Sequence, residues 1–334
     1  MDRWPFVTIG MIAKNESQYI RSAIESLAGI DYPNDCIEII FVDGNSTDGT
    51  SRIVDDFSKD AGEWKVKVFR EEKDRGGRAY SRNLIVSNSD EKAELIAFTD
   101  ADCVVKQDWL KNLVLSFNSD EGNKEYIAGA GGTRLCHEDD PFMGRAINAF
   151  LTSNIGSGYN PAFVRKKIKL TESIPNYNAI YRKIVLVENP YDEDFRGGED
   201  LELNYRLRKK GYLFMYVDAS VIHHEKASFV YFIKQMYHYG KVMAQAVKKH
   251  RTILRWYSIL PVLLVIYLLL GILFVSIVNQ PVLYAILLVP YIAFLFVSAM
   301  INTYKNKGAG LISIILMPAQ HMAYGLGFIR EMLT

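Results

Sequence analysis

The stretch Leu95-Ile96-Ala97-Phe98-Thr99-Asp100-Ala101-Asp102 decides the fold class of this chain. Its apolar residues are typical of a strand that is buried on both faces, and two carboxylates follow one residue apart. Open α/β sheets bind ligands at the carboxyl ends of their strands, so Asp100 and Asp102 are expected at a ligand-binding edge. Carboxylates this close repel each other unless a cation neutralises them, and oxygen ligands suit Mg²⁺ or Mn²⁺. The stretch therefore predicts a divalent-cation site that holds a diphosphate, although surface turns also contain Asp-x-Asp.

Short apolar runs alternate with amphipathic stretches in the first part of the chain. This alternation is typical of βαβ units and predicts an α/β domain with a mostly parallel sheet. Asn15 is expected to cap the first helix. Residues 140–175 carry no pattern that assigns them to a strand or a helix. The predicted strands cover 6–12, 37–42, 65–69, 95–98 and 212–217, and the predicted helices cover 16–27, 50–58, 78–86 and 198–209.

The composition excludes some classes of protein. The net charge is +1, and no basic stripe with interleaved aromatic residues is present, which argues against a nucleic-acid-binding protein. Cys36, Cys103 and Cys136 lack the spacing of a metal or redox motif and fit a reducing compartment. The start of the chain lacks the basic and apolar regions of a signal peptide. Residues 1–226 are therefore expected to form a cytoplasmic domain.

The last part of the chain is strongly apolar, and residues 258–304 contain no Asp, Glu, Lys or Arg. Two membrane spans are predicted, over about 258–278 and 281–304. Pro290 is expected to kink the second span. Lysines and arginines flank both ends of this hairpin, which predicts that both ends are cytoplasmic. A third apolar segment, about 308–333, either spans the membrane, re-enters it or packs against the rest, so 258–334 is the predicted membrane region.

A helix is predicted just before the membrane region, within residues 227–257. Apolar side chains recur at helical spacing from Phe229 to Val247, and lysines share the opposite face. This pattern is typical of an amphipathic helix lying on a membrane surface. The alternative is a helix whose apolar face packs on the cytoplasmic domain.

Three further motifs carry candidate chemistry. Residues 43–50 follow the second predicted strand and either dock a nucleoside or form a capped turn. Residues 74–83 combine arginines with glycines and either meet a diphosphate or form a solvated basic turn. Gly197-Gly198-Glu199-Asp200 opens a helix, where an acid serves either as a general base or as an ordinary cap. A histidine in His223-His224 is a candidate to complete a metal shell, although adjacent histidines on a strand are more often partly exposed.

The order of these motifs resembles a family-2 glycosyltransferase over roughly residues 5–245. The resemblance implies a GT-A fold and an inverting single displacement that uses a divalent cation, Mg²⁺ or Mn²⁺. It implies Asp200, with Glu199 beside it, as the catalytic base. It also implies metal ligation by Asp102 and Asp100, and His224 is the histidine that we predict, from its place in the sequence, to complete the metal shell. The residues implied in binding the nucleotide sugar are Ala13, Asn15, Glu16, Asp43, Asn45, Asp48, Arg78, Arg82, Asp100 and Ala101.

Two departures from the family bear on the acceptor. Processive synthases of this family carry Gln-x-x-Arg-Trp on an interfacial helix, whereas Gln235, His238 and Tyr239 occupy the matching positions here. Only two or three spans are predicted as well, which is few for a polymer channel. These departures favour transfer of one sugar from a UDP- or GDP-sugar to a lipid-linked acceptor at the membrane. The alternatives are a processive polysaccharide synthase, a nucleotidyltransferase and a catalytically silent membrane scaffold.

Overall fold

The computed structural model describes residues 3–62, 64–72, 75–118, 126–137, 139–153, 155–156, 169–195, 197–224, 228–286 and 288–334. The chain divides into two compact units. The first unit comprises Met1–Leu135 and Arg165–His224, and the second comprises Cys136–Val164 and Glu225–Thr334.

The first unit is built on an eight-stranded sheet with the order β3-β2-β1-β4-β9-β6-β10-β8. The pairs β1–β2, β2–β3, β1–β4 and β6–β10 are parallel, whereas β9 and β8 pair antiparallel to their neighbours. The predicted mostly parallel α/β sheet is therefore confirmed. The strands are β1 (Val7–Ala13), β2 (Ile37–Asp43), β3 (Lys65–Arg70), β4 (Leu95–Asp100), β6 (Ile127–Gly131), β8 (Lys169–Thr171), β9 (Asn178–Arg182) and β10 (Leu213–Tyr216).

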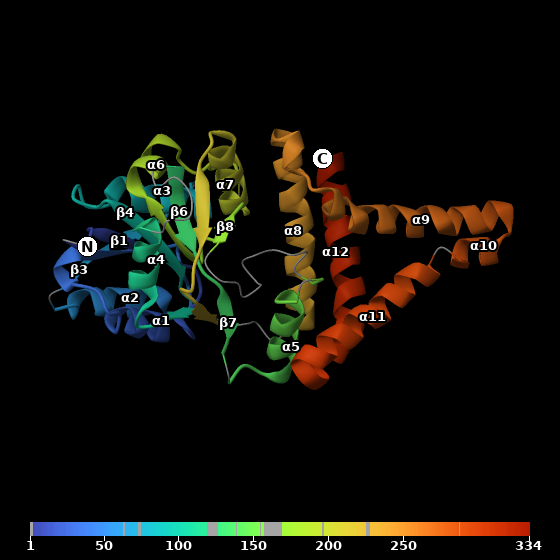
Figure 1. Cartoon of the computed structure of the whole chain (residues 1–334), viewed down its shortest axis with the longest axis horizontal. Helices are drawn as coiled ribbons and strands as arrows, with labels where there is room; N and C mark the ends of the chain where they lie inside the picture. Colours follow the sequence, from blue (N-terminus) through green and yellow to red (C-terminus); the bar gives the residue numbers. More distant parts are fainter. Residues whose placement is uncertain are drawn as a thin grey trace. The chain divides into compact units, whose positions relative to one another are not determined.

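Helices cover both faces of this sheet (Figure 1). Alternate residues of β4 point to opposite faces, because Leu95 and Ala97 join one apolar cluster and Ile96 and Phe98 join the other. One face packs against α1 (Ile20–Ala28), α2 (Thr50–Lys59) and α4 (Trp109–Leu115). The other packs against α3 (Arg78–Asn88), α6 (Lys183–Glu188) and α7 (Glu199–Lys209). Burial on both faces explains why the central strands are continuous apolar runs.

A second, three-stranded sheet has the order β5-β11-β7. Its strands are β5 (Cys103–Val105), β11 (Val221–His223) and β7 (Arg134–Cys136). The register of the antiparallel pair β5–β11 places His223 opposite Cys103, immediately after the acidic pair. This small sheet therefore brings a late part of the chain to the end of β4.

The second unit is helical within the described residues. Helices α9 and α11 extend away from α8 and α12 and meet near α10 (Figure 1). Among the described residues, three segments have the length and composition of a membrane span: Trp256–Val278, Tyr284–Tyr304 and Gly310–Leu333. The helices are α5 (Phe142–Leu151), α8 (Phe229–Lys249), α9 (Leu260–Val278), α10 (Pro281–Ile286), α11 (Val289–Asn306) and α12 (Ser313–Leu333).

Helix α8 packs along α12, and glycines set the close approach. A Cβ built on Gly240 would lie 2.0 Å from the carbonyl oxygen of Tyr324, and one on Gly327 would lie 2.1 Å from that of Tyr237. The apolar face of α8, which includes Phe232 and Met236, is buried in a cluster with residues of α5 and α12. This face is therefore covered by helices of its own unit, and the placement of residues 227–257 at the membrane interface stays a prediction.

The sequence placed two other features incorrectly, the start of the first helix and the position of strand β9. Helix α1 begins at Ile20 rather than at residue 16, and Asn15 does not cap it, because Asn15 adopts a left-handed conformation with φ 55°. Strand β9 fell outside the predicted strands. The apolar stretch 281–304 is two helices, since α10 ends at Ile286 and α11 begins at Val289, one residue before Pro290. The interruption thus lies where Pro290 was expected to kink the span.

Candidate active site

A pocket of about 430 Å³ lies at the carboxyl ends of β1, β2 and β4. The parallel register sets Ile12 beside Asp100 and Ala13 beside Asp43, so the three strands deliver their following loops to one edge. The pocket lining includes Asn15, Glu16, Arg78, Arg82, Asp100, Ala101 and Asp102 of the predicted site. It also includes Gly44 and Gly77 of the motifs 43–50 and 74–83, and Ile12, Lys14 and Glu71, which were not among the predicted site residues.

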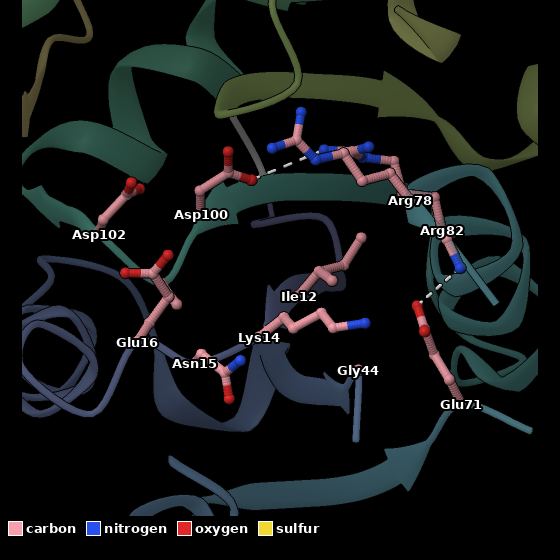
Figure 2. Close-up of a pocket in the computed structure, with 12 residues that line it drawn as sticks. Ile12, Lys14, Asn15, Glu16, Gly44, Glu71, Arg78, Arg82, Asp100 and Asp102 are labelled. Carbon is pink, nitrogen blue, oxygen red and sulfur yellow. Dashed lines mark hydrogen bonds and ion pairs between the residues drawn. The ribbon is translucent and has the colours of Figure 1, made fainter. Parts of the chain in front are cut away.

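Apart from Glu71, which lies on the same side as Lys14, the charged side chains of the pocket separate by sign (Figure 2). The carboxylates of Glu16, Asp100 and Asp102 lie on one side, and Lys14 and Arg78 lie nearer the other. Burial and the neighbouring Asp102 carboxylate raise the pKa of Asp100 above its ordinary value, against the opposite effect of Arg82. The acidic side offers hard oxygen ligands to a divalent cation, and the basic side offers charges to phosphate groups.

Hydrogen bonds join the loop after β1 to the loop after β2. The backbone N–H of Asn15 donates to Ser46 Oγ at 2.9 Å, and the Asn15 Oδ1 accepts from the N–H of Thr47 at 2.9 Å. The N–H of Ser17 donates to Asp48 Oδ2 at 2.9 Å. Asn15 and Asp48 therefore hold the two loops together at the rim of the pocket, and only Asn15 also lines it.

Asp43 and Asn45 face the loop rather than the pocket. The buried carboxylate of Asp43 accepts from Ser46 N–H at 3.2 Å and from Ser51 Oγ at 2.7 Å. The Asn45 side-chain amide donates to the carbonyl of Glu71 at 3.0 Å. In place of Asp43, the adjacent Gly44 lines the pocket, where a Cβ would lie 3.2 Å from the side chain of Lys14. Ala13 precedes these lining residues at the end of β1 and is buried in the core.

Glu71 is a pocket residue that sequence reasoning missed. It follows β3, and its Oε1 accepts from the N–H of Gly77 at 3.0 Å and from Ser81 Oγ at 2.5 Å. These bonds fasten the first turn of α3, which carries Arg78 and Arg82, to the end of β3. The sequence gives little indication of this role, because the hydrogen bonds of Glu71 depend on how the residues between Glu71 and Gly77 fold back.

Arg82 links the pocket to α7. Its side chain is 3% exposed, and its guanidinium forms an ion pair with the equally buried Glu199. The Arg82 Nη2 also lies 3.6 Å from Asp100 Oδ1, which Figure 2 marks. Burial opposes the charged form, but Glu199 and Asp100 together raise the pKa of Arg82 above its ordinary value. Arg82 is therefore a buried cation shared by two acids.

Asp200 lies beside this ion pair at the first turn of α7. Its carboxylate accepts from the N–H of Leu201 at 2.8 Å and from that of Asn176 at 3.4 Å. Burial and the neighbouring Glu199 raise the pKa of Asp200 to about 6. A carboxylate with such a pKa is a competent proton acceptor near neutral pH. Neither Glu199 nor Asp200 belongs to the pocket lining.

The histidine beside the acidic pair is His223. Its Nε2 lies 3.6 Å from Asp102 Oδ2, and the ligand atoms of Asp102, Cys103 and His223 lie within 4.8 Å of one another. The ring of His224 instead stacks on Tyr19 with centroids 4.6 Å apart. Neighbouring residues of a strand point to opposite faces, so the His223 ring reaches the Asp102 carboxylate, whereas His224 contacts Asp102 through its backbone N–H, which donates to the Asp102 carbonyl at 3.1 Å.

The predicted acceptor residues lie on α8 in the second unit. Gln235 Nε2 donates to Tyr239 Oη at 3.2 Å, one helical turn away. His238 and Tyr239 are exposed on α8. These three positions therefore form one polar patch on a helix whose apolar face is buried.

The family model of glycosyl transferase family 2 matches residues 8–183, more than half of the chain. The chain belongs to this family. The predicted family, the transferase activity and the GT-A fold are thereby confirmed. The matched residues contain the whole pocket lining.

Two archaeal relatives are similar over most of the chain. One is the dolichyl N-acetyl-alpha-D-glucosaminyl phosphate 3-beta-D-2,3-diacetamido-2,3-dideoxy-beta-D-glucuronosyltransferase of Methanococcus voltae, 25% identical over 73% of this chain and 74% of the relative. The other is glycosyltransferase AglE of Haloferax volcanii, 23% identical over 75% of this chain and 77% of the relative.

A solved structure shares the fold. The mannosyltransferase PcManGT from Pyrobaculum calidifontis, in complex with GDP-Man and Mn²⁺, superimposes with a TM-score of 0.59. The match covers 98% of this chain and 87% of that one at 17% identity. The shared fold therefore includes the helical second unit as well as the α/β unit.

Proposed function

We propose that this enzyme transfers a single sugar, with inversion, from a UDP- or GDP-sugar to a lipid-linked acceptor at the membrane. The observation that carries the proposal is one pocket that combines Asp100 and Asp102 with Lys14, Arg78 and Arg82. The acids suit a divalent cation and the bases suit phosphate groups, so together they match a metal-bound nucleoside diphosphate.

The residues at the end of β4 fit a divalent cation. Asp100 and Asp102 are only partly exposed, and burial, together with the neighbouring Asp102 carboxylate, raises the pKa of Asp100. Asp102 and Asp100 would hold Mg²⁺ or Mn²⁺, with His223 as a further donor. A bound cation would stabilise the negative charge that develops on the departing nucleoside diphosphate.

Asp200 is the proposed base. A bond forms between the acceptor hydroxyl oxygen and the anomeric carbon, the bond from that carbon to the diphosphate breaks, and the hydroxyl proton passes to Asp200. Glu199 is less suited to this role because its Oε1 forms the ion pair with Arg82 and the residue is only 2% exposed. General base catalysis of this kind contributes roughly 10²- to 10⁴-fold.

The membrane acceptor and the topology complete the proposal. The Methanococcus voltae relative is named for a dolichyl-linked sugar phosphate acceptor, and the second unit here carries three candidate spans. We place residues 1–226 in the cytoplasm and the interfacial segment 227–257 at the membrane surface, with 258–334 as a multi-pass membrane region. Gln235, His238 and Tyr239 are the proposed acceptor-side residues on α8.

The test is transfer by the purified full chain in lipid vesicles, supplied with radiolabelled UDP- and GDP-sugars and an extract of lipid-linked acceptors. We expect one donor to give a glycolipid lengthened by one sugar, together with free UDP or GDP. Release of pyrophosphate would instead identify a nucleotidyltransferase, and a long polymer would identify a processive synthase. Asp200→Asn is the matched control, because it removes only the base.

A further inference from the structure

Arg82 stands between an acid that lines the pocket and an acid that does not. Its guanidinium contacts Glu199 of α7 directly and lies 3.6 Å from Asp100 at the end of β4. Arg82 and Glu199 are both almost fully buried, whereas the Asp100 side chain is 30% exposed. The buried pair therefore lies behind Asp100, on its protein side.

The hydrogen-bonding capacity of this pair is incompletely used within the described part of the chain. Arg82 Nε and Glu199 Oε2 are buried there without a hydrogen-bond partner. Burying two charges is costly, and a well-packed apolar pair of the same size is often as stable. A buried, incompletely hydrogen-bonded ion pair next to a functional pocket is thus better explained by its effect on the pocket than by its contribution to stability.

The effect of each charge on the pocket has a definite sign. A positive Arg82 beside Asp100 competes with any cation that Asp100 and Asp102 would bind. The negative charge of Glu199 opposes that competition, because it lies against the same guanidinium and partly cancels the positive potential at Asp100. Fixed charges several ångströms apart interact substantially in a partly buried site, where the effective dielectric constant is about 20.

We infer that Glu199 is a positioning residue that screens Arg82 and thereby preserves the affinity of Asp100 and Asp102 for a divalent cation. When no cation is bound, the positive charge of Arg82 in turn offsets the repulsion between the Asp100 and Asp102 carboxylates. This inference rests on the proposed function only in taking Asp100 and Asp102 as the cation site, and it assigns Glu199 no proton transfer.

The test is Mn²⁺ binding to the purified full chain in detergent, followed by the electron paramagnetic resonance of free Mn²⁺. We expect Glu199→Gln to weaken Mn²⁺ binding by about three- to tenfold and Arg82→Gln to tighten it by a similar factor. Both variants lose the same ion pair, so a merely structural role would weaken binding in both. The opposite signs are the signature of charge tuning.

Matched controls come from an exposed ion pair that joins α7 to the residue after β8. Arg208 of α7 lies 3.2 Å from Glu172, and neither residue lines the pocket. We expect Arg208→Gln and Glu172→Gln to leave Mn²⁺ affinity unchanged. The charge-conserving variants Glu199→Asp and Arg82→Lys are expected to bind within about twofold of the unsubstituted chain, because the charges persist.

The outcomes separate the two proposals. Changes of the same sign in Glu199→Gln and Arg82→Gln, or no change in either, overturn the inference while the cation site stands. A loss in the charge-conserving variants as large as in Glu199→Gln attributes the effect to shape and also overturns it. If the unsubstituted chain does not bind Mn²⁺, or if its binding does not depend on Asp102, the cation site itself fails and the inference fails with it.

Discussion

Gly240 of α8 lies directly against the backbone of Tyr324 of α12, with room for no side chain between them. Gly327 of α12 lies in the same way against Tyr237 of α8. Two reciprocal glycines let the helix axes approach until backbone meets backbone, which is the usual role of small residues between membrane helices. The two helices therefore behave as one packed element of the second unit.

We expect Gly240→Leu to separate α8 from α12, because the new side chain would overlap the Tyr324 carbonyl. Overpacking typically costs about 1–3 kcal/mol, and contact with backbone places this variant at the upper end. The measurement is the thermal unfolding temperature in detergent. Lys234→Leu, on the exposed side of the same helix, is the control and should change it little. Equal melting of the two variants would contradict the packing described.

Asp48 should contribute to the stability of the pocket rim. Desolvation raises the pKa of Asp48, but hydrogen bonds from Thr50 and Ser17 outweigh this effect and hold that pKa well below its usual range. We expect Asp48→Ala to cost about 1 kcal/mol, the usual net contribution of a hydrogen bond. Because the folded pKa is lowered, this contribution is present at neutral pH and is lost as the pH falls below about 4.

Urea unfolding followed by circular dichroism measures this contribution. Asp56→Ala is the control, because the Asp56 carboxylate is 60% exposed and its nearest basic partner, Arg52, lies 3.7 Å away at the surface. The same loss of stability in both variants, or a loss in Asp48→Ala that persists unchanged at acid pH, would show that the rim does not depend on this carboxylate.

The pH dependence of turnover should report Asp200. A base must be ionised to accept a proton, and the pKa of Asp200 is raised to about 6 by burial and by Glu199. We therefore expect kcat to rise with pH through about 6 and to reach a plateau above it. Asp200→Asn should abolish this rise together with turnover while donor binding persists. The exposed Asp194 offers the control Asp194→Asn, and a profile flat down to pH of about 4.5 would remove Asp200 from the role.

Chelation should abolish transfer, and Mg²⁺ or Mn²⁺ should restore it, because the diphosphate leaves with its negative charge uncompensated when no cation is present. Asp102→Asn should resist restoration at cation concentrations that suffice for the unsubstituted enzyme. Radiolabelled transfer measures both effects. Asp60→Asn, at the exposed end of α2, should behave as the unsubstituted enzyme. Full activity in excess chelator would rule out the cation.

The parts of the site that the sequence predicted are those in which the functional residues directly follow a recognisable strand in the sequence. Asp100 and Asp102 end an apolar strand, and a strand end in a parallel sheet has a fixed place. Asp48 and Asn45 were predicted to bind the nucleotide. In the structure, Asp48 accepts a hydrogen bond from the backbone of Thr50, and Asn45 donates one to the backbone of Glu71. A loop motif shows that polar groups are needed but not whether they face ligand or backbone.

The features that the sequence missed depend on pairing between distant segments. Strand β9 is five residues long and lies antiparallel between β4 and β6, a position that no local pattern indicates. The choice of His223 over His224 depends on the register of β11 against β5. The amphipathic pattern of α8 showed that one face would be buried, but the covering helix lies about eighty residues further on.

All the residues that line the pocket fall between Ile12 and Asp102. If this pocket holds the activated sugar, the donor contacts are encoded in one early, contiguous block of the gene, and only Glu199, Asp200 and His223 of the proposed machinery lie downstream, where the remaining residues can diverge with the molecule that receives the sugar. A chimaera that keeps this block and exchanges the remainder with a relative should retain its donor and change its product.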